Sequence, residues 1–464
     1  MRASGTRAAV RRGVLFHTVQ FFAFFAIVWL IARALPHRAE NVFLLVASYV
    51  FYASWDPRFL ALVMLSTTVD FVVAQRIRAA AHRKRAFRWA AGSVAYHLTV
   101  LCVFKYHGFF IHGAGLALPV GVSFYTFQSM AYVIDVYRRR VAPVTDPIEF
   151  ALFVAFFPQL LAGPIERAAK VIPQIRSPRR FSPDHVRDGA YLIFSGLVKK
   201  LFIADNLAPY TRWGLTGAAT GFDAYLVCVA FAIRIYCDFA GYTDLARGFA
   251  KLLGFDLSPN FDRPFFASSP ATFWMRWHIS LTRWITDYLY GPLRRWLMDR
   301  GIRRSIAIAI AIMIGRIAMG VWHRATLGYV LWGALWGLIV VVARPFELAR
   351  VARGEVSSRA RRVLGALLVF HVFAFTLILT SAPLGRCVEM WTLLGSGFAP
   401  GAAGLRDLAA IAWYIAPLAV LELVGPAALA RVPVGVRSAL YAVMLVLLVS
   451  GGSTSGEEFV YYAF

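Results

Sequence analysis

The sequence predicts an all-α, polytopic membrane protein with about 11–12 transmembrane helices, together with re-entrant and interfacial helices around a central tunnel. Two features of the composition support this fold class. The chain of 464 residues is 59% hydrophobic and only 16% charged, whereas soluble domains carry about 25% charged residues. Many windows also reach the length of about 20 mostly apolar residues that a membrane-spanning helix needs.

The formal net charge of +25 is distributed in short loops between apolar segments. This is the positive-inside pattern of cytoplasmic loops that face anionic lipid. Because no basic element lies in a soluble domain, we expect no nucleic-acid partner. The basic loops are Arg76 to Arg88, Arg138 to Arg140, Arg167 to Arg187, Arg294 to Arg304 and Arg344 to Arg362.

The first predicted span is Val14 to Leu35, which is too long and has too poor a cleavage site for a signal peptide. Residues 1–13 form a basic N-terminal extension with four arginines. With the next basic loop inside, three spans would place these arginines outside, against the positive-inside rule. The extension is therefore a possible start-site artefact, with translation starting near Val14, and residues 14–464 form a single integral membrane domain.

Most of the remaining apolar segments are predicted to span the membrane. They are Val42–Ser54, Phe59–Ala74, Trp89–Phe104, Leu118–Val136, Ala190–Ala208, Tyr225–Phe239, Ile306–Val321, Thr326–Val342, Val363–Thr380, Ile411–Val424 and Ala439–Val449. The run Phe150–Ile165 is interrupted by prolines and glycine, and a re-entrant hairpin there keeps the next basic segment inside. Gly241–Pro292 is amphipathic and aromatic, which is typical of interfacial helices.

Two histidines beside tryptophans are the main candidates for chemistry. His323 follows Trp322 near the start of an apolar segment, and a neutral imidazole there is a possible general base. A packed structural histidine explains His323 equally well. His278 follows Arg276-Trp277 in an aromatic run, where a helix would place Trp274 on the face of His278. An interfacial aromatic belt is the alternative for this run.

Charged residues within or beside spans are the next candidates, because charge at membrane depth is costly. Asp238 lies four residues after Arg234, so the two can pair on one helical face, which is a structural role. Asp70 and Asp135 are expected to be interfacial partners of basic residues. Gly333 and Gly337 form a GxxxG motif that permits close helix approach. The four cysteines form no CxxC pair, so neither a disulfide framework nor a metal site is expected.

Motifs spread over nearly the whole chain resemble the bacterial branch of the membrane-bound O-acyltransferase family. This branch includes the membrane protein of alginate O-acetylation and the D-alanyl transfer protein of teichoic acids, and the motifs are most like the alginate type. The matching stretches are Leu45–Trp55, Pro119–Gln128, Ala131–Tyr137, Phe157–Arg167, Gly196–Asn206, the two histidine segments and Phe459–Phe464.

The resemblance implies an enzyme that transfers an acyl group, expected to be acetyl, to hydroxyls of an extracytoplasmic polysaccharide. Carried over, His323 is the catalytic base and His278 binds or polarises the acyl group of the donor. Trp277, Trp322, Asp238 and Arg276 are then candidates for the tunnel wall. No bound cofactor is implied. The donor would be acetyl-CoA or an acylated carrier protein, and the partners a periplasmic acyltransferase or glycan-export proteins.

The expected location is the bacterial cytoplasmic membrane, with the lipid bilayer as the first partner. The sequence departs from the family pattern at Arg324, where a glycine is usual, at Gly291–Arg295, and at Trp336, where a histidine is frequent. These departures leave three further readings open. They are D-alanyl-type or other acyl transfer to a cell-envelope polymer, transport through the same helices, and an inactive scaffold.

Overall fold

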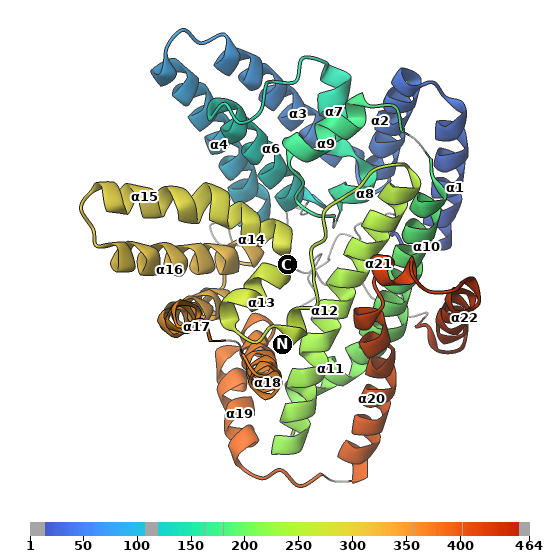
Figure 1. Cartoon of the computed structure of the whole chain (residues 1–464), viewed down its shortest axis with the longest axis vertical. Coiled ribbons are helices and arrows are strands. Elements are labelled where there is room, and N and C mark those ends of the chain that lie inside the picture. Colours follow the sequence, from blue (N-terminus) through green and yellow to red (C-terminus); the bar gives the residue numbers. More distant parts are fainter. Residues whose placement is uncertain are drawn as a thin grey trace, which may run out of the picture. The chain divides into compact units, whose positions relative to one another are not determined.

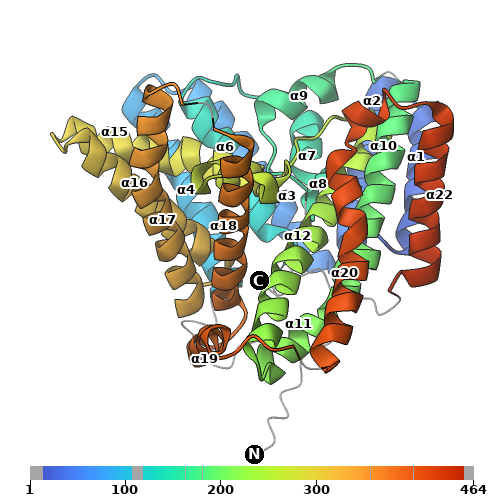
Figure 2. The ribbon, with the colours of Figure 1, turned by 60° about the horizontal axis from the view of Figure 1, so that its bottom comes forward.

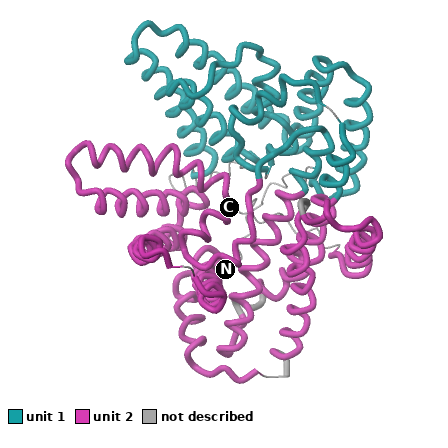
Figure 3. The backbone as a smooth tube through the Cα atoms, viewed as in Figure 1, with its two compact units in different colours: residues 1–190, 245–258 teal, residues 191–244, 259–464 magenta. Residues whose placement is uncertain are grey.

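The computed structural model describes residues 14–106, 119–161, 163–179, 181–355, 357–400 and 402–453. These residues form helices and loops, with no strand in the described ranges, which confirms the predicted all-α class (Figure 1). The basic extension at residues 1–13 and the closing motif at 459–464 lie outside the described residues. The chain divides into two compact units, residues 1–190 with 245–258, and residues 191–244 with 259–464 (Figure 3).

Unit 1 is built from antiparallel helices around a core rich in phenylalanine. Its helices are α1 (Val19–Ala34), α2 (His37–Ala53), α3 (Pro57–Arg78), α4 (Arg83–Lys105), α6 (Val122–Tyr137), α7 (Pro147–Ala155), α8 (Phe157–Leu160), α9 (Ala168–Arg176) and the start of α10 (Pro183–Leu197). A tight turn joins α2 to α3, and there the Asp56 side chain accepts a hydrogen bond from the Arg58 backbone N–H (2.9 Å) at the start of α3.

The predicted interruption after Phe150 is present as a break between α7 and α8. Phe156 leaves the helical conformation just before Pro158, and every side chain from Leu152 to Leu160 is buried. Buried irregular backbone needs internal hydrogen bonds, and the Gln128 amide supplies one by donating to the Phe153 carbonyl (2.6 Å). The re-entrant course of this segment stays a prediction.

Unit 2 carries both candidate histidines, and it includes the long helices drawn in orange and red in Figure 2. Its elements are the C-terminal half of α10, a π-helical turn η1 (Val198–Ala204), α11 (Asp205–Gly217), α12 (Gly221–Leu252, to Asp244), η2 (Pro264–Phe266), α13 (Pro270–Arg276), α14 (Ile279–Ile285), η3 (Thr286–Tyr290), α15 (Gly291–Asp299), α16 (Arg304–His323), α17 (Leu327–Ala352), α18 (Arg359–Leu377), η4 (Ile378–Thr380), α19 (Leu384–Gly395), α20 (Ala402–Leu423), α21 (Pro426–Leu429) and α22 (Val434–Gly451).

Eight helices of the described chain are long and apolar enough to cross a membrane: α3, α4, α12, α16, α17, α18 with η4, α20 and α22. The shorter α1, α2 and α6, with 16–17 residues each, account for much of the difference from the predicted total. Apolar side chains remain exposed along α17, α18 and α22, as expected for helices that face lipid rather than water. The protein is therefore a multi-pass membrane protein.

Two expectations about single segments are wrong. The chain was expected to leave the helix near Gly241, but α12 continues to Leu252, because Gly241 packs against the Gly196 carbonyl instead of breaking the helix. Asp70 was expected at the membrane interface, but it is fully buried. It accepts hydrogen bonds from Ser93 and His97 (2.7 Å each) between α3 and α4.

Candidate active site

His278 lies at a break between two short helices, not within one helix as the sequence predicted. Helix α13 ends at Arg276 and α14 begins at Ile279. The backbone of His278 is left-handed, with φ 43° and ψ 56°, a conformation that is uncommon for residues other than glycine. The helix-face pairing of Trp274 with His278 is therefore wrong, and the imidazole direction is set by the turn.

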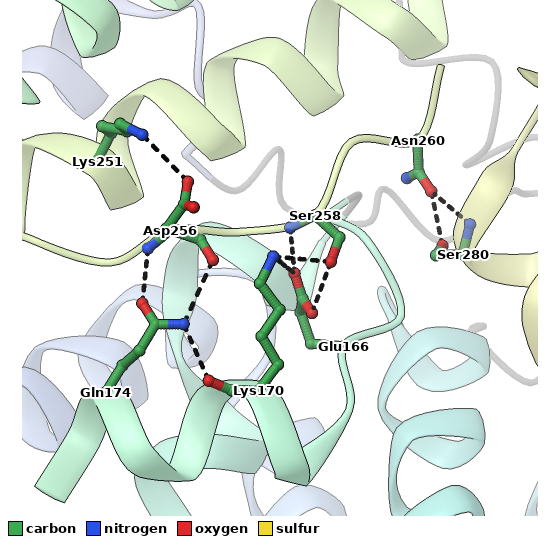
Figure 4. Close-up of polar contacts among 8 residues, drawn as sticks. All are labelled: Glu166, Lys170, Gln174, Lys251, Asp256, Ser258, Asn260 and Ser280. Carbon is green, nitrogen blue, oxygen red and sulfur yellow. Dashed lines mark hydrogen bonds and ion pairs between the residues drawn. The ribbon is translucent and has the colours of Figure 1, made fainter. Parts of the chain in front are cut away.

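Asn260 fixes this turn through three hydrogen bonds. Its backbone carbonyl accepts from the Ile279 N–H (2.8 Å). Its side-chain Oδ1 accepts from the Ser280 hydroxyl (2.6 Å) and the Ser280 N–H (3.3 Å), as Figure 4 shows. Asn260 itself is fully buried and donates to the Thr243 hydroxyl (3.4 Å). The first N–H groups of α14, which lack partners within the helix, are thus bonded by one residue.

His323 is the last residue of α16, and close packing of α16 on α17 positions it. A Cβ atom at Gly333 would lie 2.5 Å from the Arg316 carbonyl oxygen, and one at Gly337 would lie 2.8 Å from the Met313 sulfur. Gly320 likewise packs against the Tyr329 carbonyl. The predicted role of the GxxxG motif in close helix approach is therefore confirmed.

The two histidines approach each other within unit 2. Their ring centroids are 6.5 Å apart, although they come from different helices. Trp322 packs edge-on against both rings, with centroid distances of 6.1 Å to His278 and 4.8 Å to His323. Phe239 of α12 also packs edge-on against His278, with a centroid distance of 4.7 Å. One small reacting group can contact both imidazoles across such a distance, because catalytic hydrogen bonds span about 3 Å each.

The two rings differ in their access to solvent. His278 is 1% exposed, and burial lowers its pKa to about 3, because an apolar surrounding disfavours the charged imidazolium. His278 is therefore neutral at physiological pH and has one N–H to donate. His323 is partly exposed at the end of its helix.

Comparison with known proteins identifies the family of the chain. Residues 136–378 match the model of the MBOAT, membrane-bound O-acyltransferase family, and this segment includes both histidines. A probable alginate O-acetylase of Azotobacter vinelandii is 34% identical over 80% of this chain and 75% of its own length. The chain belongs to the membrane-bound O-acyltransferase family. It is an acyl-transferring enzyme by class.

Two further relatives are similar over most of the chain. A probable alginate O-acetylase of Pseudomonas aeruginosa is 38% identical over 66% of this chain, and the chain spans 61% of that relative's length. A peptidoglycan O-acetyltransferase of Helicobacter pylori is 30% identical over 72% of this chain and 71% of its own length.

The remaining predicted site residues of the acyltransferase lie in three different surroundings. Trp277 is buried against Phe261 (5.1 Å) and Phe373 (4.6 Å), next to His278 in the chain. Asp238 binds Lys200 of η1 (2.7 Å), which also binds Asp205, so it belongs to a buried ion cluster. The side chain of Arg276 lines a separate cavity of about 290 Å³ with Arg263.

The buried ion cluster continues along α12 and supports the aromatic wall of the site. Lys199 binds Asp244 (2.8 Å) and approaches Glu422 of α20 (3.8 Å). The Tyr236 hydroxyl donates to the same Glu422 carboxylate (2.5 Å), while its ring packs on Trp277 (6.0 Å). Lysine–carboxylate pairs thus anchor the helix face that carries Tyr236 and Phe239.

Sequence reasoning missed several residues of the site. Tyr329 and Trp332 of α17 pack against His323 at 6.1 and 6.4 Å, and Trp336 packs on Trp274 (5.3 Å). Their spacing of three and four residues forms one helical stripe, which was a usable signal. Asn260 gave no such signal, since its partners lie seventeen and more residues away in the chain.

The segment that leads to Asn260 is held by polar contacts within unit 1 (Figure 4). The buried Glu166 carboxylate accepts from the hydroxyl of Ser258 (3.1 Å) and from its N–H, and Lys170 donates to that hydroxyl (2.9 Å). The Gln174 amide oxygen accepts from the Asp256 N–H (2.7 Å). Burial raises the pKa of Glu166.

In the described ranges, no group of three or more histidine, cysteine or acidic residues is arranged for a metal ion.

Proposed function

We propose that the protein transfers an acetyl group from a thioester donor on the cytoplasmic side to hydroxyls of an extracytoplasmic polysaccharide. The observation that carries this proposal is the 6.5 Å separation of the His278 and His323 rings. At this spacing one imidazole can contact the acceptor hydroxyl while the other contacts the acyl group of the donor. The names of the relatives support a polysaccharide acceptor, since they refer to alginate and peptidoglycan.

In the proposed mechanism, His323 acts on the acceptor. Its neutral imidazole takes the proton of the acceptor hydroxyl as the oxygen attacks the carbonyl carbon of the thioester. The tetrahedral intermediate then collapses, the carbon–sulfur bond breaks, and the imidazolium of His323 returns the proton to the sulfur. The products are an ester and a thiol. A positioned base of this kind contributes about 10²- to 10⁴-fold in rate.

His278 acts on the donor in this mechanism. The imidazole stays neutral because burial lowers its pKa to about 3, so it donates one N–H to the carbonyl oxygen on which negative charge develops. The left-handed turn and Asn260 hold this N–H in a fixed direction. The aromatic side chains packed on the buried His278 keep water away from the donor carbonyl, which limits hydrolysis of the thioester.

The proposal includes the setting of the reaction. We infer that the protein lies in the bacterial cytoplasmic membrane, with the donor thioester, acetyl-CoA or an acylated carrier protein, reaching it from the inside. The acceptor polysaccharide lies outside, where a periplasmic acyltransferase or glycan-export proteins would act with it.

The test is the content of ester-linked acyl groups in the surface glycans of three strains. These are the wild type, a deletion strain, and the deletion strain complemented with His323→Ala at matched protein level. Mild base releases the esters, and identification of the released acid distinguishes acetate from D-alanine. The complementing wild-type gene is the matched control.

We expect the esters to disappear in the deletion strain and to return with the wild-type gene but not with His323→Ala. Full restoration by His323→Ala would show that His323 is structural. If the ester content of every glycan fraction were unchanged in the deletion strain, a polysaccharide would not be the acceptor. That result would favour the interpretation as a transporter or a scaffold.

A further inference from the structure

Glu422 is a buried carboxylate near the end of α20, and its contacts lead towards the site. Its side chain is 9% exposed, although α20 is apolar and long enough to cross a membrane, where a carboxylate is costly. Its Oε1 atom accepts a hydrogen bond from the Tyr236 hydroxyl (2.5 Å) and lies 3.8 Å from the Lys199 Nζ atom. Glu422 lies outside residues 136–378, the segment that matches the family model.

Tyr236 joins this carboxylate to an aromatic cluster formed by Tyr236, Phe261, Phe265 and Trp277. Its ring packs on the other three at 5.3, 4.9 and 6.0 Å, in that order. Trp277 in turn packs on Phe261 (5.1 Å) and Phe265 (6.3 Å). A buried tyrosine hydroxyl needs a hydrogen-bond partner, and the ring moves with its hydroxyl because it is rigid. The position of Glu422 therefore sets the position of the Tyr236 ring.

The aromatic cluster borders the turn that carries His278. Trp277 directly precedes His278 in the chain. Phe261 contacts Phe239 (5.1 Å), which packs on the His278 ring (4.7 Å). Phe261 also follows Asn260, whose carbonyl and side chain bond the first residues of α14. A displaced Tyr236 ring would therefore disturb His278 through both its preceding residue and its supporting turn.

The end of α20 borders the same segment through a second residue. Leu423, which follows Glu422, lines the cavity of about 290 Å³ together with Arg276, the last residue of α13. Two consecutive residues of α20, one polar and one apolar, therefore lie close to the segment that leads into His278.

We propose that Glu422 is a positioning residue of the acyl-transfer site. It holds Tyr236 by the hydrogen bond, Tyr236 holds the aromatic cluster, and the cluster keeps the His278 imidazole in its direction. The acceptor oxygen is the feature that matters, because Lys199 has its own ion pair with Asp244 (2.8 Å). Glutamine should therefore replace Glu422, whereas alanine should not. Only the need for a fixed His278 in acyl transfer rests on the proposed function.

Hydrogen–deuterium exchange at the His278 turn tests the positioning role without any substrate. The Ile279 and Ser280 N–H groups are the reporters, because both donate to Asn260. Exchange of peptides that cover residues 277–282 is measured by mass spectrometry on the full chain in dodecyl maltoside. Glu422→Ala and Tyr236→Phe should accelerate exchange there by at least about tenfold, and Glu422→Gln should stay within about threefold of the wild type.

Tyr225→Phe is the matched control, since it also removes a hydroxyl from α12. That hydroxyl bonds His371 (3.1 Å), and the Tyr225 ring packs on Phe375 and Phe398. Exchange at the turn should stay within about twofold of the wild type. Equal acceleration by Tyr225→Phe and Tyr236→Phe would overturn the proposal, as would unchanged exchange in Tyr236→Phe. Because Tyr236→Phe keeps the ring, it decides the matter if Glu422→Ala does not fold.

A second measurement links the turn to acyl transfer. It is the rate at which ester-linked acyl groups accumulate in surface glycans of the deletion strain, complemented at matched protein level. Glu422→Ala and Tyr236→Phe should lower this rate by about tenfold, and Glu422→Gln should restore most of it. Faster exchange with an unchanged rate would overturn the proposal. If instead His278→Gln keeps the wild-type rate, the proposed function of His278 fails, while the exchange data still decide whether Glu422 fixes the turn.

Discussion

The two histidine segments of this acyltransferase position their imidazoles in different ways. His278 sits in a left-handed turn, buried, with Asn260 bonding the residues that follow it. His323 sits at the open end of a long helix and depends on glycines that bring α16 and α17 into backbone contact. One imidazole is therefore fixed and kept neutral, and the other is left accessible to gain and lose a proton. This difference matches the two roles that acyl transfer requires.

The largest expected effect is on kcat, and together with stability it distinguishes the role of His323 from that of His278. His323→Gln should lower kcat by about 10²- to 10⁴-fold, because it removes the proposed base. It should change the free energy of unfolding by less than about 1 kcal/mol, because the side chain is partly exposed. His278→Gln should lower both kcat and stability. Acyl transfer by purified protein and thermal unfolding in detergent give the two quantities, and equal stability losses in the two variants would contradict the comparison.

The second effect concerns the support of His278. Asn260→Ala should destabilise the protein by about 2–4 kcal/mol, since two buried donors of Ser280 lose their acceptor. It should also lower kcat by roughly tenfold with little change in KM, because a displaced His278 imidazole is no longer oriented towards the reacting group. Asn260→Asp keeps the acceptor oxygen and should recover most of kcat. Thr243→Val, which removes only the 3.4 Å contact, is the control, and a kcat loss there equal to that of Asn260→Ala would refute the positioning role.

The third effect is the pH dependence of stability. The folded pKa of His278 is about 3, below its ordinary value of about 6.5, so the unfolded state binds more protons between these values. Its contribution to stability is therefore present above about pH 6.5 and is lost as the pH falls. Between pH 7.5 and pH 5 the loss should be about 2 kcal/mol. Denaturation curves give the free energy of unfolding at each pH, and between pH 7.5 and pH 5 the wild type should lose about 2 kcal/mol more than His278→Asn. Parallel pH profiles of the two proteins would contradict this prediction.

The smallest effect concerns the support of His323. Gly333→Ala places a methyl group 2.5 Å from the Arg316 carbonyl oxygen, so α16 and α17 must move apart, at a cost of about 1–2 kcal/mol. Activity should fall in parallel, since His323 ends α16. Gly385→Ala on α19, where no atom lies within 4 Å of the added carbon, should be neutral or slightly stabilising. A neutral Gly333→Ala would show that the close approach is not needed.

The sequence predicted many of the spans for physical reasons, whereas the joint role of the two histidines was implied only by the family resemblance. Apolar runs lie in lipid and basic loops lie in water, so the sequence marks the ends of a span. Helices α16 and α17 accordingly begin and end within a few residues of their predicted bounds, apart from the longer C-terminal part of α17. The close packing of α16 on α17 was readable from Gly333 and Gly337, since small residues four apart mark one helical face.

The unpredicted features all depend on residues distant in sequence. The helix break at His278 follows no glycine or proline, and it exists because Asn260 bonds Ile279 and Ser280. The burial of Asp70 depends on His97 of the next helix. One cavity of unit 2 is lined by arginines from α14, α15, α16 and α17, and the sequence gives no sign that basic residues so far apart in the chain share one cavity.

The left-handed backbone at His278 has a consequence for genetic experiments on this position. In a library of all substitutions, the abundance of folded protein should be ordered by tolerance of positive φ and not by resemblance to histidine. Glycine and asparagine should accumulate well, and β-branched residues such as valine and isoleucine poorly. Abundant but inactive alleles would then mark the contribution of the imidazole itself, while scarce alleles would report only on the chain that carries it.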